Sequence, residues 1–445
     1  MLKKLILENW KSFRYAELYF DPLTVLIGTN ASGKSNLVEA LEFLRRMATG
    51  ETVDVALNGD RSLSSIRGGS NFIVNRNNLQ ENRFVLKSIV GNDNLTQEII
   101  YSGNFYIKSD LEYLLEEVLS LHDVNGDNEL IKISSQYHSY LTKIILPKIP
   151  SNLNIFKNLY QQYKSYDDFK HNFDHEIDSK LEQLEILGID NKSREDLIKD
   201  MYEDHLDNVY RHIIYPQEIK DSFSKLFIIN PIPSQMRDFS RLSEKLEQDT
   251  SNIAGFLAAL PDERKLEVES NLSHYLEHFP EGDIKKVWAE KVGRLGTDAM
   301  LYCQEEWQPG QITEIDARSM SDGTLRLVGI LTALLTRPEG SLIVIEEIDN
   351  GLHPSRAELL VKILREIGTK RKIDLLITTH NSALLDALGP EIIPFVTVVH
   401  RDAETGESKL TLLEDIENLP KLLATGSLGK LATKGTIEKT LAKSI

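Results

Sequence analysis

A glycine-rich segment, GTNASGKS, has the residue types and spacing that bind nucleoside triphosphates. It runs from Gly28 to Ser35, directly after the apolar run LTVLIG, and fits G-x-x-x-x-G-K-[ST] between a strand and a helix. Backbone N–H groups from Asn30 to Ser35 can surround a phosphate because Gly28 and Gly33 carry no Cβ. We expect Lys34 to reach the β- and γ-phosphates of ATP, and the Ser35 hydroxyl to be a ligand of Mg²⁺. A glycine-serine turn that only caps a helix is the alternative.

Two carboxylates end the apolar run SLIVIEE, residues 341–347. A buried strand fixes the position of the residues at its end, so we expect Glu346 to hold Mg²⁺ through water. Glu347 would orient or deprotonate the water that attacks the γ-phosphate. His380 ends another apolar run, LLITTH, where it would hydrogen-bond the γ-phosphate or the attacking water. Taken alone, a histidine at a strand end also fits a structural role.

Such residues need a sheet that brings the ends of its strands together. Three apolar runs in the first fifty residues predict strands, and the spacing of apolar residues from Ser35 to Met47 predicts a helix. Residues 84–106 predict an antiparallel layer. From residue 321 onward, helices and apolar strands alternate, which predicts a parallel sheet covered by helices. We therefore expect an α/β P-loop NTPase fold with a mostly parallel sheet, an antiparallel side layer and a helical insertion.

The predicted insertion covers residues 108–225, where LEYLLEEVLSL, YHSYLTKIIL and KLEQLEILGI read as helices. It separates an N-terminal part of the ATPase domain, residues 1–107, from a C-terminal part, residues 226–445. Its acidic composition fits a helical lobe that faces water, and also fits a docking surface for a partner. The string DVNGDNE is not a calcium loop, because Asn128 stands where glycine is needed and Ser134 where glutamate is needed.

Composition limits the class of protein. The 445 residues are 41% hydrophobic and 27% charged, which indicates a folded chain of two or three domains. A net charge of −17 disfavours non-specific binding of nucleic acid, so such contact would need a local basic patch. Candidate patches are the lysines near the N-terminus and KLATKGTIEKTLAKSI, although solvated lysines are the simpler interpretation.

A cytoplasmic protein without a membrane span is expected. No apolar stretch reaches the length of a membrane helix, and Asn9 and Lys11 interrupt the first apolar run too early for a secretory signal. The single cysteine, Cys303, excludes an intrachain disulfide and a multi-cysteine metal cluster, and it indicates a reducing compartment.

Five motifs, in order, resemble those of the ABC-type ATPases of the RecF, SMC and Rad50 class. Compact bacterial ATPases that carry SDGT followed by EE-x-x-NGLHP, as in Septu-like antiphage defence systems, are particularly similar. The resemblance implies an ABC ATPase-like fold and hydrolysis of ATP and water to ADP and phosphate. The motifs are LILENWKSF, GTNASGKSN, SMSDGTLRL at 319–327, IEEIDNGLHPSR at 345–356 and ITTHNSALLDAL at 377–388.

The string SMSDGTLRL resembles the signature motif of this class. The resemblance implies that Ser321 and Gly323 contact the γ-phosphate of the nucleotide bound by another copy of the chain. It therefore implies a homodimer or higher homo-oligomer with head-to-tail ATP sites, whose hydrolysis is slow and depends on dimerisation. Asp322 replaces a glycine of the motif, and Thr324 replaces its usual glutamine or glutamate.

Other departures concern neighbouring motifs. Glu346 stands where an aspartate is common, and His353 stands where many relatives have an aspartate that contacts the opposite protomer. The glutamine that contacts magnesium in this class cannot be assigned, and Arg67-Gly68-Gly69 lies in the corresponding region.

The resemblance implies a sensor or scaffold subunit of a bacterial antiphage complex, with a separate effector nuclease or toxin. A RecF-like DNA-repair ATPase that acts on duplex DNA is the alternative. Transport is disfavoured because no membrane span is expected, and a long coiled coil is excluded because sustained heptads are missing. A small-molecule kinase would leave SDGT without a role. The sequence after His380 is too short for an appended nuclease domain.

Overall fold

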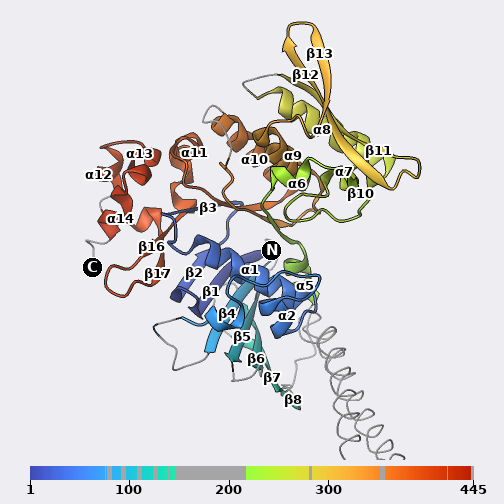
Figure 1. Ribbon diagram of the computed structural model, residues 1–445. Helices are drawn as coiled ribbons and strands as arrows, with labels where there is room; N and C mark the ends of the chain where they lie inside the picture. Colours follow the sequence, from blue (N-terminus) through green and yellow to red (C-terminus); the bar gives the residue numbers. More distant parts are fainter. Residues whose placement is uncertain are drawn as a thin grey trace, which may run out of the picture. The chain divides into compact units, whose positions relative to one another are not determined.

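The computed structural model describes most of the chain as two units (Figure 1). The first unit comprises Met1–Glu17 and Glu39–Ser224, and the second comprises Leu18–Val38 and Lys225–Ile445. No helix in the described part of the chain is long and apolar enough to cross a membrane. The described residues are 1–75, 77, 83–91, 97–107, 113–123, 129–138, 141–145, 217–279, 283–350, 356–417 and 419–441.

The first unit contains a seven-stranded sheet with the order β2-β1-β4-β5-β6-β7-β8. Strand β1 pairs with β4, and each strand from β4 to β8 pairs with the next, always antiparallel. The predicted antiparallel layer is therefore confirmed. The strands are β1 (Leu2–Trp10), β2 (Phe13–Tyr19), β4 (Arg83–Gly91), β5 (Gln97–Ile107), β6 (Tyr113–Asp123), β7 (Glu129–His138) and β8 (Leu141–Ile145).

The helical interpretation of residues 113–145 was wrong, because β6, β7 and β8 are strands. Strand β6 pairs with β5 along its whole length, from Tyr113 opposite Ile107 to Asp123 opposite Gln97. This non-local pairing overrides a local pattern that fits a helix equally well. The third predicted helix, KLEQLEILGI, lies outside the described residues, and the insertion as a domain stays a prediction.

An aromatic cluster fills the core of the first unit. The ring of Phe43, on α1, lies 5.8 Å from Trp10 and 5.0 Å from Phe105 between centroids, and Phe84 stacks on Phe105 at 4.8 Å. All four side chains are buried, so they anchor the later turns of α1 to the sheet. The helices of this unit are α1 (Lys34–Ala48, which starts in the second unit), α2 (Val53–Asn58), α5 (Gln217–Ser224) and the 3₁₀ helix η1 (Gly69–Phe72).

The second unit contains a six-stranded sheet with the order β17-β16-β3-β15-β14-β9. All neighbours pair in parallel except β16 and β17, which are antiparallel. The predicted fold class, α/β with a mostly parallel sheet and an antiparallel layer, is therefore confirmed. The strands are β3 (Leu23–Ile27), β9 (Leu226–Ile229), β14 (Leu342–Ile345), β15 (Asp374–Thr378), β16 (Val396–Arg401) and β17 (Ser408–Leu412).

Parallel pairing brings the carboxyl ends of β3, β9, β14 and β15 to one edge of this sheet. Ile345 pairs with Ile229 on one side and with Ile377 on the other, and Thr378 pairs with Leu26. The loops that follow these strands therefore start side by side, as in other open α/β sheets, where ligands bind at this edge.

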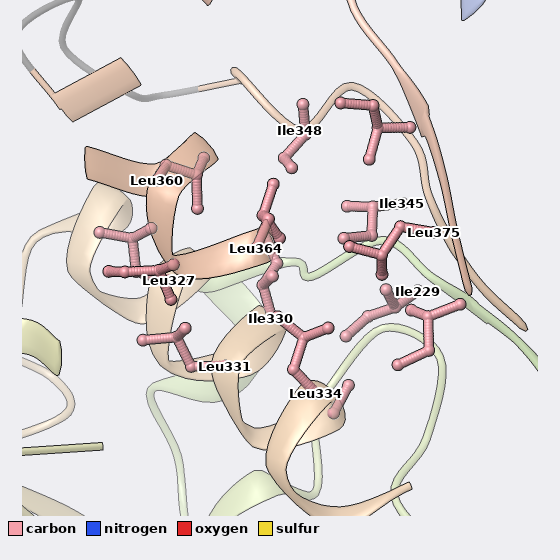
Figure 2. Close-up of a cluster of buried hydrophobic side chains, with 14 of the residues drawn as sticks. Ile229, Leu327, Ile330, Leu331, Leu334, Ile345, Ile348, Leu360, Leu364 and Leu375 are labelled. Atoms are coloured by element: carbon pink, nitrogen blue, oxygen red, sulfur yellow. The ribbon is translucent and has the colours of Figure 1, made fainter. Parts of the chain in front are cut away.

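Helices α9 (Asp322–Thr336) and α10 (Ala357–Arg371) cover the sheet with apolar side chains. Figure 2 shows Leu327, Ile330 and Leu334 of α9 packed with Leu364 of α10 and with Ile345 of β14. The remaining helices are α6 (Pro233–Met236), α7 (Ile253–Ala259), α8 (Asp262–Glu277), α11 (Ser382–Leu388), α12 (Leu419–Leu423), α13 (Leu428–Thr433), α14 (Thr436–Leu441), η5 (Pro390–Phe395) and η6 (Leu413–Asp415).

A smaller antiparallel sheet in the same unit precedes α9. Strand β12 pairs with β10, β11 and β13, and the β12–β13 hairpin forms the arm at the top of Figure 1. The strands are β10 (Ser240–Arg241), β11 (Ile284–Val292), β12 (Asp298–Gln308) and β13 (Gln311–Asp316).

Candidate functional site

The glycine-rich loop connects β3 to α1 through backbone conformations that favour glycine. Gly28 has φ 149°, and a Cβ at this position would lie 2.1 Å from the carbonyl oxygen of Val399, so no other residue fits without a shift of backbone. Gly33 has φ 122°, and Ala31 adopts φ 62°, which is uncommon for alanine. The loop is therefore held in a shape that a continuous strand or helix would not adopt.

The β16–β17 hairpin supports this loop through two hydrogen bonds. Arg401 Nε donates a 2.9 Å hydrogen bond to the carbonyl oxygen of Ala31, and the Ser408 hydroxyl donates to that of Ser32. These contacts satisfy two loop carbonyl groups, while Asn30 and Ser35 remain exposed. The residues predicted to face the phosphates and Mg²⁺ are thus accessible.

Lys34 starts α1 and turns back over the loop. Its Nζ donates hydrogen bonds to the carbonyl oxygens of Gly28, at 2.6 Å, and Thr29, at 3.0 Å. Burial lowers the pKa of Lys34, and attraction to Glu347, Glu438 and Asp349 opposes that shift. The neighbouring carboxylates favour the protonated form of Lys34, and partial burial strengthens the attraction of that charge for an anion.

The two glutamates predicted from SLIVIEE follow β14 directly. The amide of Glu346 donates to Ile229 of β9 at 3.3 Å, and the amide of Glu347 donates to the Thr378 hydroxyl of β15 at 2.8 Å. Glu347 is exposed and has φ 45°, a strained conformation for a residue other than glycine. Such strain persists where surrounding contacts impose it, and it concentrates at functional sites.

His380 follows β15 and faces a buried carboxylate that the sequence analysis did not select. Nδ1 of His380 lies 4.0 Å from Oδ2 of Asp349, whose side chain is only 6% exposed. Oδ1 of Asp349 is buried and accepts no hydrogen bond from the described residues. A buried acid among apolar neighbours is a signal that the string IEEID contains, because Asp349 follows the buried Ile348.

Ser321 and Gly323 lie at the start of α9. Ser321 is its N-cap, and the serine hydroxyl accepts a 3.1 Å hydrogen bond from the amide of Thr324. The Thr324 hydroxyl also lies 2.8 Å from the Ser321 hydroxyl, so the threonine that replaces the usual glutamine or glutamate restrains the serine. Ser321 is exposed and Gly323 is buried.

Arg326, one turn further along α9, is a charged residue inside an apolar helix. It is 8% exposed, and its Nη2 donates to Asn230 Oδ1 at 3.3 Å. Burial lowers the pKa of Arg326, while attraction to Glu347, Asp349 and Asp322 opposes the shift. The arginine therefore places a positive charge near Glu347 and Asp349, two of the acidic residues that follow β14. The sequence analysis missed it, although a lone arginine in TLRLVGILTALLT was a usable signal.

The structure brings most of the predicted residues to one edge of the sheet. Lys34 and Glu347 interact electrostatically there, and His380 lies beside Asp349. Ser321 and Gly323 do not join this group. The side chain of Ser321 contacts Thr324 in the described part of the chain. His353 lies outside the described residues.

The donor set fits ATP with magnesium. The Ser35 hydroxyl and the Glu346 carboxylate offer hard oxygen ligands, which Mg²⁺ prefers. The backbone N–H groups of the glycine-rich loop can donate hydrogen bonds to phosphate oxygens. In the described ranges, no group of three or more His, Cys, Asp and Glu side chains could hold a metal ion. Magnesium needs no such group here, because it is usually bound by one or two carboxylates together with substrate phosphates.

A phosphate-binding loop after a central parallel strand, in the same sheet as a strand that is followed by two carboxylates, defines the class of P-loop nucleoside triphosphatases. The family described as "AAA domain, putative AbiEii toxin, Type IV TA system" matches residues 23–386. The chain belongs to this family and is an ATPase of the AAA type. The match confirms the resemblance to ABC-type ATPases of the RecF, SMC and Rad50 class.

Solved structures of SMC heads are also similar. The SMC head domain from Thermotoga maritima has 14% identity and a TM-score of 0.41, and the match covers 92% of this chain and 98% of that one. A Smc head bound to the C-winged helix domain of ScpA has 13% identity and a TM-score of 0.44, with 92% and 96% covered. Because both TM-scores lie below 0.5, these structures contribute no evidence on function. Comparison with curated proteins found no similar sequence.

Proposed function

We propose that the protein hydrolyses ATP at sites shared between two copies, and that it acts as the sensor or scaffold subunit of a bacterial antiphage complex. The protein would be cytoplasmic, and the effector, a nuclease or toxin, would be a separate chain. The observation that carries this proposal is that Lys34, whose Nζ donates to the carbonyl oxygens of the phosphate loop, is attracted by Glu347 after β14. The exposed Ser321, in contrast, lies at the start of α9.

Within one copy, the loop from Gly28 to Ser35 would bind the phosphates through its backbone amides, and Lys34 would leave its carbonyl partners for the β- and γ-phosphates. Glu347 would accept the proton of the attacking water, and His380 would orient that water or the γ-phosphate. Ser35 and Glu346 would hold Mg²⁺, which neutralises developing charge on the phosphate oxygens when bound.

The second copy would supply Ser321 and Gly323 to the γ-phosphate of the first. Phosphoryl transfer depends on positioning and on neutralising charge, so a single copy that lacks these donors should hydrolyse ATP slowly. ATP would then favour a closed pair and hydrolysis would open it, which gives a two-state change for a partner to detect.

The role in defence draws support from the family, whose description names a toxin and a type IV TA system. The net charge of −17 opposes broad binding of duplex DNA, so it favours this role over the RecF-like alternative.

Phosphate release measured against protein concentration tests the shared site. The rate per chain should rise as the protein is concentrated, and the Lys34→Ala variant should show no release at any concentration. A rate per chain that is independent of concentration from nanomolar upward, with a monomeric mass, would contradict the proposal. Duplex DNA should leave the rate unchanged, whereas strong stimulation that weakens with salt would favour the repair alternative.

A further inference from the structure

Arg237 holds the loop that leads into α9. This arginine ends α6, and its Nη1 donates hydrogen bonds to the carbonyl oxygens of Ala317 at 3.1 Å, Arg318 at 2.9 Å and Met320 at 2.7 Å. Three carbonyl groups that converge on one guanidinium nitrogen fix the path of the backbone just before Ser321. A lysine in place of Arg237 would not reproduce these contacts, because an ammonium group lacks the planar, forked arrangement of N–H donors of a guanidinium.

The same guanidinium pairs with Asp322 through Nη2. Asp322 replaces the middle glycine of the signature motif, and its side chain is 69% exposed, whereas that of Arg237 is 29% exposed. The carboxylate therefore lies at the surface beside Ser321, where it would repel a triphosphate unless a cation balances it. Arg237 supplies that balance.

The segment from Asn230 to Arg237 links this loop to the acidic strand end. It begins directly after β9, whose last residue, Ile229, accepts the hydrogen bond from Glu346. Asn230 contacts Arg326 on α9, and Arg237 contacts Asp322 at the start of the same helix. The segment thus contacts α9 at two points and joins it to the strand beside Glu346.

We propose that Arg237 is a positioning residue for the shared ATP site. It fixes Ser321 for contact with the nucleotide of a second copy, and it cancels the charge of Asp322 on the surface that meets that nucleotide. This inference rests on the proposed function, because it requires that the start of α9 meets the triphosphate of another copy. It adds to the proposed function a residue outside every recognised motif and a role for Asp322.

The test measures ATP-dependent pairing in a Glu347→Gln background, in which hydrolysis is slow. Light scattering gives the dissociation constant of the pair with ATP and Mg²⁺, and a fluorescent ATP analogue gives the affinity of the single chain. We expect Arg237→Gln to weaken pairing by at least ~10-fold, since one charge-assisted contact is removed. Asp322→Asn should weaken it less, and the double variant should pair better than Arg237→Gln alone. Affinity of the single chain for ATP should not change.

Arg264→Gln is the matched control. Arg264 also pairs with a carboxylate, Glu267, and donates to a carbonyl oxygen, that of Leu335 at the far end of α9. This control should pair like the parent. Arg237→Lys, which keeps the charge but loses the fork, provides a second variant if Arg237→Gln does not fold, and it should show intermediate pairing.

The outcomes separate the two proposals. If the Glu347→Gln parent does not pair with ATP, the shared site itself is wrong. If the parent pairs and both Arg237 variants pair as tightly, the shared site stands and the role of Arg237 is rejected. Failure of Asp322→Asn to improve pairing of Arg237→Gln would likewise reject charge cancellation.

Discussion

Oδ2 of Asp349 lies 4.0 Å from Nδ1 of His380, where the loops after β14 and β15 run side by side. The aspartate is buried and the histidine is mostly exposed. Asp349 also attracts Lys34 and Arg326. One buried carboxylate therefore faces the histidine and contributes to the field around two cations, and under the proposed mechanism it would act as a positioning residue.

Asp349→Asn should lower the steady-state rate of ATP hydrolysis by about 10-fold, because His380 loses the carboxylate that orients it. Affinity for ATP should change little. In a His380→Ala background the same substitution should have a much smaller effect, since the group that it orients is gone. Equal effects in both backgrounds would show that Asp349 acts independently of the histidine.

Lys34→Ala should abolish nucleotide binding, because the loop loses the lysine that would contact the β- and γ-phosphates. Titration with a fluorescent ATP analogue measures this directly, and circular dichroism checks that the fold is retained. Binding as tight as that of the wild type would remove the assignment of the phosphate loop.

Glu347→Gln should retain ATP while hydrolysis falls by roughly 10²- to 10³-fold, the loss expected when one well-placed catalytic group is withdrawn. The substitution keeps the shape of the side chain and the hydrogen bond from the Glu347 amide to Thr378. Single-turnover measurement of phosphate release separates the chemical step from binding. A normal rate would show that another group activates the water.

Cys303 should be unreactive in the folded protein. Burial raises the pKa of this thiol, with repulsion from Glu305 as a further cause, and the protonated thiol is a poor nucleophile. A thiol reagent at pH 8 should label the native protein slowly and the protein in guanidinium chloride completely. The single cysteine makes the signal unambiguous, and rapid labelling of the native chain would contradict the burial of β12.

The parallel sheet and its site were predictable where local sequence carries the information. Apolar runs bounded by glycine, acidic residues or serine predict the phosphate loop, the strand before Glu346 and the helix after Ser321. The antiparallel strands after residue 113 were not predictable in this way, because pairing with β5 is set by residues distant in sequence.

The supporting residues were missed for a related reason. Arg237 contacts the carbonyl group of Ala317, 80 positions away in the sequence, and the carboxylate of Asp322, 85 positions away. Asn230 and Arg326 likewise meet only through the fold. Motif spacing shows which residues can do chemistry, whereas the contacts that hold them in place depend on tertiary structure.

Mixing two inactive variants tests the shared site most directly. Lys34→Ala lacks a working phosphate loop but keeps Ser321, and Ser321→Arg keeps the loop but blocks the surface that meets another copy's nucleotide. Each variant alone should be inactive, and an equimolar mixture should recover about a quarter of the wild-type rate, because half of the pairs are mixed and each has one complete site. No recovery in a mixture that demonstrably forms mixed pairs would contradict a nucleotide held between two copies.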